Sequence, residues 1–171
     1  MLSPKIQAAI NAQLNLELES SYAYLGIAAF FEATAMPGMA RWMRVQSEEE
    51  HTHAMRLFEH VHARGGAVTL QPIEKPATKF KSALAAFEAS LGHERKVTNA
   101  INKLYALAQA EQDYPSQVML QWFINEQVEE EKNVGTVIDQ LRMAGDSPSA
   151  LLMLDQMLGS RTEGAEGNPQ A

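Results

Sequence analysis

Four long stretches of this chain carry apolar residues at the spacing of an amphipathic helix, and proline and glycine residues separate them. The breaks fall at residues 36–38, at Gly65-Gly66, at residues 113–115 and at residues 145–148. A shorter fifth helix is expected over residues 149–158. The four long helices are expected over residues 3–35, 39–64, 79–112 and 115–144.

The lengths of the connections limit how these helices can pack. Short turns join the first helix to the second and the third to the fourth, so each pair must be antiparallel. Residues 67–78, which contain Pro72 and Pro76, are long enough to run along the whole bundle. The pattern predicts an all-α four-helix bundle with one long crossover and a short fifth C-terminal helix. Residues 1–158 would form one domain, and the polar tail 159–171 is predicted to be disordered.

The composition excludes several classes of function. The chain has no cysteine, which removes disulfides and thiolate metal sites, and its net charge of −7 argues against a nucleic-acid surface. No stretch approaches the roughly 18 continuous apolar residues that a membrane span needs. The N-terminus lacks the apolar segment of a secretory signal. We therefore expect a cytoplasmic protein with no nucleic-acid or membrane partner.

Each long helix places one glutamate where its apolar stripe predicts a core residue. At about 100° per residue, Glu50 falls between Met43 and Leu57 on the second helix, and His53 lies at the edge of that stripe. Each of the other three long helices also carries one such glutamate near its middle. These glutamates are Glu17, Glu94 and Glu130, with Gln127 one turn before the last.

Four buried carboxylates need a compensating charge, because burial of an isolated ionised carboxylate costs several kcal/mol. No lysine or arginine lies on the stripes at this level, whereas two divalent cations would neutralise all four. Carboxylate and imidazole ligands suit iron, manganese or zinc. The alternatives are protonated carboxyls or a plain bundle with hydrogen-bonded polar groups in its core.

Two further groups of residues have an ordinary and a functional interpretation. Tyr24 and Trp122 are either core aromatics or redox and hydrogen-bonding partners of the centre. Glu49, Glu126 and Glu129 are either solvated or ligands of a secondary metal site, because their helical phases lie beside those of the core glutamates.

At these residues the sequence resembles the bacterial non-haem ferritins, over nearly the whole chain from Leu2 to about Leu158. The resemblance rests on Glu17, Glu49-Glu50-x-x-His53, Glu94 and Glu126-Gln127-x-x-Glu130, followed by the short fifth helix. It implies a ferritin-like bundle. It also implies two iron ions: one would be held by Glu17, Glu50 and His53, and the other by Glu50, Glu94 and Glu130, with Glu50 as the bridge and Gln127 nearby.

The resemblance carries further expectations about the site. Glu49, Glu126, Glu129 and Glu130 match a third, inward-facing iron site, and Tyr24 and Trp122 match aromatics beside the centre. Bacterioferritins and rubrerythrins carry Glu-x-x-His on both paired helices, whereas the second copy here reads Gln127-x-x-Glu130. His51 stands where bacterioferritin has its haem-binding methionine, so no haem is expected.

The implied function is iron storage. Fe²⁺ would be oxidised by dioxygen at the di-iron centre, and the ferric product would be deposited as an oxide-hydroxide mineral inside a hollow 24-chain shell. The apolar residues of the fifth helix would meet around the fourfold axes; they are Leu151, Leu152, Leu154, Met157 and Leu158. The alternatives are a non-storing di-iron or di-manganese enzyme, a DNA-protecting mini-ferritin of twelve chains, and a metal-free bundle.

Overall fold

The chain folds into five helices, and a computed structural model describes residues 2–161. The described part contains no strand, as the sequence predicts. No helix in it is both long enough and apolar enough to cross a membrane. The helices are α1 (Pro4–Ala33), α2 (Pro37–Ala63), α3 (Ala83–Ala110), α4 (Tyr114–Ala144) and α5 (Pro148–Leu158).

The helix boundaries agree with the predicted ones to within two residues except at the start of α3. The sequence pattern places that start at Lys79, but the helix begins at Ala83. The reason is a local cap: the Ser82 hydroxyl accepts a hydrogen bond from the backbone N–H of Ala85. Phe80 therefore lies before the helix, where its ring contacts that of Phe30 edge-on at 5.3 Å between centroids.

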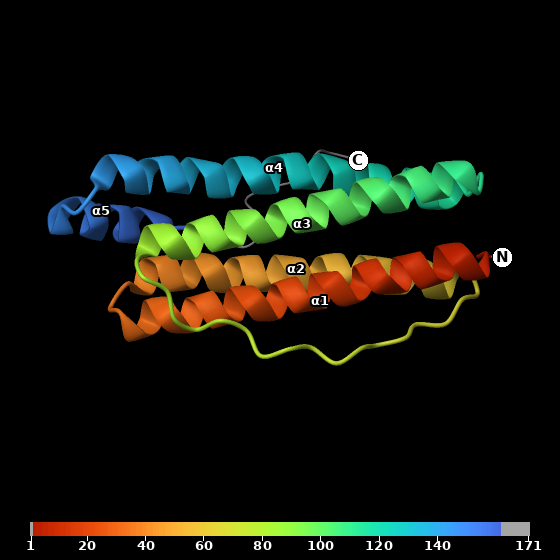
Figure 1. The fold of residues 1–171 in the computed structure, drawn as a ribbon, viewed down its shortest axis with the longest axis horizontal. Coiled ribbons are helices and arrows are strands. Elements are labelled where there is room, and N and C mark those ends of the chain that lie inside the picture. Colours follow the sequence, from red (N-terminus) through yellow and green to blue (C-terminus); the bar gives the residue numbers. More distant parts are fainter. Residues whose placement is uncertain (1, 162–171) are drawn as a thin grey trace.

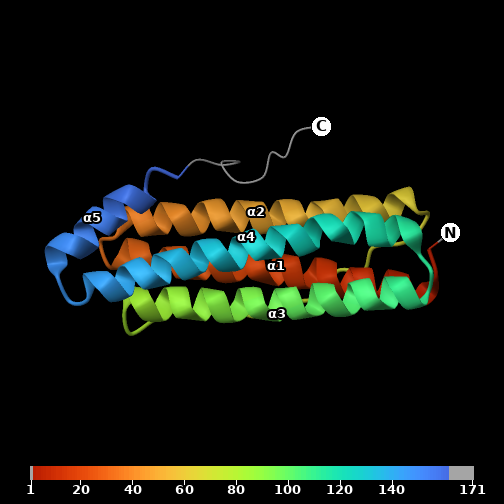
Figure 2. The ribbon, with the colours of Figure 1, turned by 90° about the horizontal axis from the view of Figure 1, so that it is seen from above.

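Figures 1 and 2 show two antiparallel hairpins, α1–α2 and α3–α4, joined by the crossover that runs along the outside of α1. The crossover has no regular structure, and side chains of α1 form hydrogen bonds with some of its backbone N–H and C=O groups. Asn11 bonds to Ala67 O and Thr69 N, and Asn15 bonds to Thr69 O and Gln71 N. The predicted long, extended connection between the second and third helices is thus confirmed.

The core consists of two apolar clusters with a polar layer between them. One cluster, at the α5 end, includes Phe31, Met43 and Phe87, and the other, at the opposite end, includes Ile10 and Leu57. No Cα atom of α2 lies within 8 Å of a Cα atom of α4, in contrast to the closer pairs α1–α2 and α3–α4. Polar side chains bridge part of this wider space: Gln46 of α2 donates a hydrogen bond to Glu130 of α4.

The short helix α5 packs across the end of the bundle against α2 and α4 (Figure 2). Leu154 and Leu158 are buried in this chain's own core, and Leu151 packs against it. The expectation that Leu154 and Leu158 meet other chains is therefore wrong, because one face of α5 is used within the bundle. For Leu151, which is only partly buried, it stays a prediction. The outward face carries Leu152, Met153 and Met157, which are 59%, 72% and 49% exposed.

Asp155 fastens α5 to the start of α2. Its carboxylate accepts hydrogen bonds from Met39 N at 2.8 Å and Gly38 N at 3.1 Å, so it caps two N–H groups that have no partner within the helix. A Cβ atom on Gly38 would lie 1.8 Å from Asp155 O. Only glycine allows this approach, and the contact fixes where the chain leaves α5.

Replacing Asp155 with alanine should lower the free energy of unfolding by about 2 kcal/mol, because two buried N–H groups lose their acceptor. Urea unfolding of the metal-free protein at fixed chain concentration measures the change. Asp139→Ala, which removes an exposed carboxylate on α4, is the control and should change stability by less than about 0.5 kcal/mol. Equal losses in the two variants would contradict the capping role.

Candidate metal centre

The polar layer brings together the four core glutamates that the sequence singles out. Glu17, Glu50, Glu94 and Glu130 come from α1, α2, α3 and α4, and none is more than 3% exposed. His53, one turn after Glu50 on α2, is 4% exposed. Among the described residues, His53 is the one basic side chain that forms an ion pair with any of these four carboxylates.

Glu17, Glu50 and His53 form the tighter half of the layer. One ligand atom from each lies within 4.8 Å of the others, and His53 Nδ1 lies 3.4 Å from Glu50 Oε2. Glu17 Oε2 and Glu50 Oε2 are buried and meet no hydrogen-bond donor in residues 2–161. Such oxygens are costly to bury unless a cation or a proton occupies the space between them.

The other half is arranged differently from the expected second ligand set. The structure gathers Glu130 with His53 and Glu126, whose ligand atoms lie within 4.8 Å of one another. The carboxylate of Glu94 is engaged otherwise: it accepts hydrogen bonds from the Tyr24 hydroxyl and from Gln127 Nε2, the latter at 3.2 Å. Glu50, Glu94 and Glu130 do not form a cluster of this tightness in the described chain.

Three glutamines donate hydrogen bonds to the carboxylates, and only Gln127 was among the residues predicted from the sequence. Gln13 Nε2 donates to Glu17 at 2.8 Å, and Gln46 Nε2 donates to Glu130 at 2.7 Å and to Glu50 at 3.3 Å. Gln13 and Gln46 each precede a core glutamate by four residues, the spacing that places two side chains on one helix face. That spacing is the signal that would have identified both.

The two aromatics identified from the sequence lie on different sides of the layer. Tyr24 is buried against Glu94. Trp122 lies beside His53, with 5.2 Å between ring centroids, and the guanidinium of Arg56 covers its ring at 4.0 Å. Trp122 therefore limits the positions that the imidazole can adopt.

The residues expected for a third site do not gather as one cluster. Glu126 joins His53 and Glu130, whereas Glu129 is exposed. Glu49 is held by a residue that the sequence analysis missed: Arg161 Nη2 donates to Glu49 Oε2 at 2.6 Å. Arg161 lies within the tail predicted to be disordered, and the remainder of that tail, residues 162–171, lies outside the described residues.

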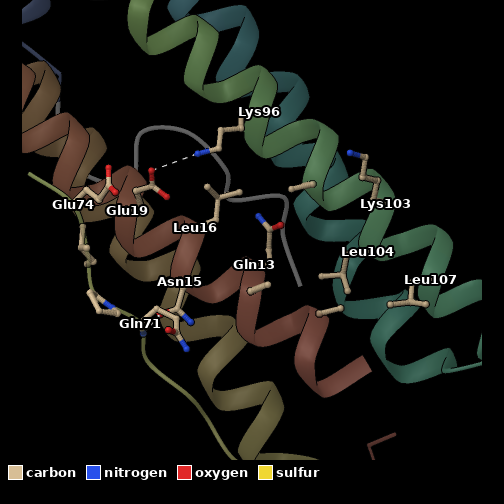
Figure 3. Close-up of a pocket in the computed structure, with 15 residues that line it drawn as sticks. Gln13, Asn15, Leu16, Glu19, Gln71, Glu74, Lys96, Lys103, Leu104 and Leu107 are labelled. Carbon is tan, nitrogen blue, oxygen red and sulfur yellow. Dashed lines mark hydrogen bonds and ion pairs between the residues drawn. The ribbon is translucent and has the colours of Figure 1, made fainter. Parts of the chain in front are cut away.

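A groove on the outer surface approaches the polar layer from α1. It has a volume of roughly 780 Å³ and lies between α1, the crossover and α3 (Figure 3). The Lys96 ammonium and the Glu19 carboxylate pair across it at 3.4 Å. Gln13 lines the groove and also bonds to Glu17, so one side chain separates the groove from the buried carboxylates.

Burial raises the pKa of all four core glutamates, and at Glu17, Glu50 and Glu130 repulsion by another core glutamate adds to the effect. The pKa of Glu17 and of Glu130 is raised first by desolvation and then by the charge of Glu50, and that of Glu50 by desolvation and then by Glu94. Desolvation also raises the pKa of Glu94, although hydrogen bonds from Tyr24 and Gln127 oppose it. The folded chain thus binds protons here more tightly than the unfolded chain does.

Residues 7–144 match the ferritin-like domain family. The chain is 37% identical to a bacterial non-heme ferritin of Bacteroides fragilis, over 94% of this chain and 100% of that protein. It is 36% identical to one of Escherichia coli, over 94% and 97%. A solved structure of an open pore ferritin from the archaeon Archaeoglobus fulgidus superposes with a TM-score of 0.93 at 41% identity, covering 95% and 100%. The chain belongs to the ferritin family, which confirms the resemblance and the fold predicted from the sequence.

Divalent cations should displace protons from this centre, because the raised pKa values mean that these carboxyls hold protons more tightly than ordinary glutamates do. Affinity for Zn²⁺ should therefore rise with pH. The stability that these groups give the metal-free protein should fall as pH rises above the ordinary glutamate pKa, since the folded state binds the protons more tightly. Calorimetry in buffers of different ionisation enthalpy measures the protons released. Binding that neither releases protons nor varies with pH would contradict this account.

Proposed function

We propose that this chain is an iron-storage ferritin that oxidises Fe²⁺ with dioxygen at the buried carboxylate centre. The observation that supports it best is the pair of buried oxygens, Glu17 Oε2 and Glu50 Oε2, which lack hydrogen-bond donors among residues 2–161 and lie beside His53. Membership of the ferritin family makes iron the natural cation. Iron is here the substrate and the stored cargo.

The ligands of the first Fe²⁺ would be Glu17, Glu50 and His53. The second would bind to Glu130 and to Glu50 as the bridging carboxylate, with Glu94 and Gln127 beside it. In the observed side-chain positions Glu130 lies nearer His53 and Glu126, so Glu50 and Glu94 would turn toward the second ion when it arrives.

Each Fe²⁺ loses one electron to dioxygen in the proposed reaction. Carboxylate oxygens are hard ligands and stabilise the ferric state over the ferrous state. The centre has one imidazole and several carboxylates, so we expect it to release Fe³⁺ for storage rather than to keep a resident metal pair. Haem plays no part in this proposal.

Storage requires a container that one bundle cannot provide. We propose assembly into a hollow shell of 24 copies, as the resemblance to ferritins implies. The exposed apolar residues of α5, namely Leu152, Met153 and Met157, would be covered there by neighbouring copies. The acidic net charge of −7 suits a cavity that attracts iron ions. A cytoplasmic location and the absence of nucleic-acid and membrane partners remain part of the proposal.

Stopped-flow absorbance of ferric formation tests the proposal directly. Metal-free protein mixed aerobically with increasing Fe²⁺ should show a fast phase that saturates near two iron ions per chain, followed by slow mineral growth. Saturation near three would add the third site, which includes Glu49, Glu126 and Glu129. A fast phase without later growth would favour a non-storing enzyme, and a rate equal to that without protein would exclude a ferroxidase.

Glu50→Ala should reduce the fast oxidation phase at least about a hundredfold, because it removes the bridging ligand and one of the two oxygens without a hydrogen-bond donor. Stopped-flow absorbance at two Fe²⁺ per chain measures the loss. Glu59→Ala removes an exposed carboxylate from the same helix and should leave the rate unchanged. An unchanged oxidation rate in Glu50→Ala would contradict the assignment of Glu50 to the site of oxidation.

Tyr24→Phe should slow oxidation by about threefold to tenfold while leaving the number of bound Fe²⁺ ions unchanged. The substitution removes one hydrogen bond to Glu94, worth about 1 kcal/mol, and deletes no ligand. Anaerobic Fe²⁺ binding and stopped-flow oxidation measure the two quantities separately. Loss of one bound ion would show instead that Tyr24 is needed to hold the site together.

A further inference from the structure

Arg161, which follows α5, lies against the inner part of the bundle with its side chain only 8% exposed. Its Nη1 donates to Gln46 Oε1 at 2.9 Å, and its Nη2 donates to Glu49 Oε2 at 2.6 Å. The guanidinium also lies over the Trp42 ring, 4.6 Å from the ring centroid. These three contacts together bury a positive charge beside a group of carboxylates.

Gln46 connects this guanidinium to the metal centre. A guanidinium can only donate and an ionised carboxylate can only accept, so the amide oxygen of Gln46 must face Arg161 and its nitrogen must face the carboxylates. Gln46 Nε2 accordingly donates to Glu130 and Glu50. One amide group thus separates the Arg161 charge from two ligands of the proposed iron centre.

We propose that Arg161 is a built-in cation that holds Glu49 and competes with a metal ion for the carboxylates of the third site. The inference rests on the proposed function and refines its third site. The guanidinium engages Glu49 Oε2 at 2.6 Å, so a cation that Glu49 shared with Glu126 and Glu130 would have to compete with the Arg161 charge for that carboxylate. Arg161 therefore lowers the affinity of the third ion and leaves the first two largely unaffected.

The position of Arg161 is determined by the fold rather than by chance contact. Asp155 caps the start of α2, and Gly38 allows the chain to leave α5 close to that helix. The backbone oxygen of Arg161 accepts a further hydrogen bond from Arg41 Nε at 3.3 Å. Because binding linkage is reciprocal, an ion at the third site should also weaken the binding of Arg161 to α2.

Equilibrium titration of the metal-free, full-length protein with Zn²⁺, which undergoes no oxidation, tests this proposal. Wild type should bind two ions tightly and a third weakly. Arg161→Gln should bind the third about tenfold or more tightly, because it removes a competing charge at contact distance, and should leave the first two constants within about twofold. Arg161→Lys, which keeps the charge but not the forked geometry, should lie between them.

Two controls separate this effect from a general change of charge. Arg44→Gln removes an arginine from α2 that pairs with Glu32, and it should leave the third constant unchanged. In a Glu49→Gln background, Arg161→Gln should no longer have an effect. An unchanged third constant with two tight ions intact overturns the role of Arg161 alone. The absence of two tight ions in every variant overturns the proposed centre, and this inference with it.

Discussion

The cost of burying four carboxylates in one layer is the constraint on which the rest of this structure depends. Each long helix contributes one glutamate to a layer enclosed by two apolar clusters, and burial raises the pKa of all four. A plain helical bundle would gain stability by filling these positions with leucine. The four glutamates are explained if the layer binds cations, and if protons occupy the carboxylates when no cation is bound.

The surrounding polar groups differ in how firmly they hold each carboxylate. Glu94 has both a phenol and an amide as donors, whereas Glu17 and Glu50 each keep one oxygen without a donor in the described chain. The bundle therefore fixes one carboxylate by hydrogen bonds and leaves two oriented toward the space beside His53. A centre that takes up and releases its ions needs this combination, because a fully hydrogen-bonded layer would compete with the metal.

The wider spacing between α2 and α4 leaves room for further polar side chains beside the carboxylate layer. Gln46 crosses it to Glu130, and Arg161 reaches Gln46 from beyond α5. The short C-terminal helix thus has two roles in this chain: its outward face carries the apolar residues proposed for assembly, and its end delivers a positive charge to the edge of the centre. Assembly and ion binding would then be coupled through one segment.

The sequence by itself determined the helices, the crossover and the four core glutamates. Helical periodicity and helix breakers are local properties of the chain, and the apolar stripe of a single helix is enough to place Glu17 or Glu50 at a core position. It missed Gln13 and Gln46, although the four-residue spacing to each glutamate was available. Only the tertiary structure decided that α5 buries Leu154 and Leu158 and that Arg161 holds Glu49. It also decided that Glu130 gathers with His53 and Glu126 rather than with Glu50 and Glu94. These outcomes depend on contacts between residues far apart in the chain, which no local pattern encodes.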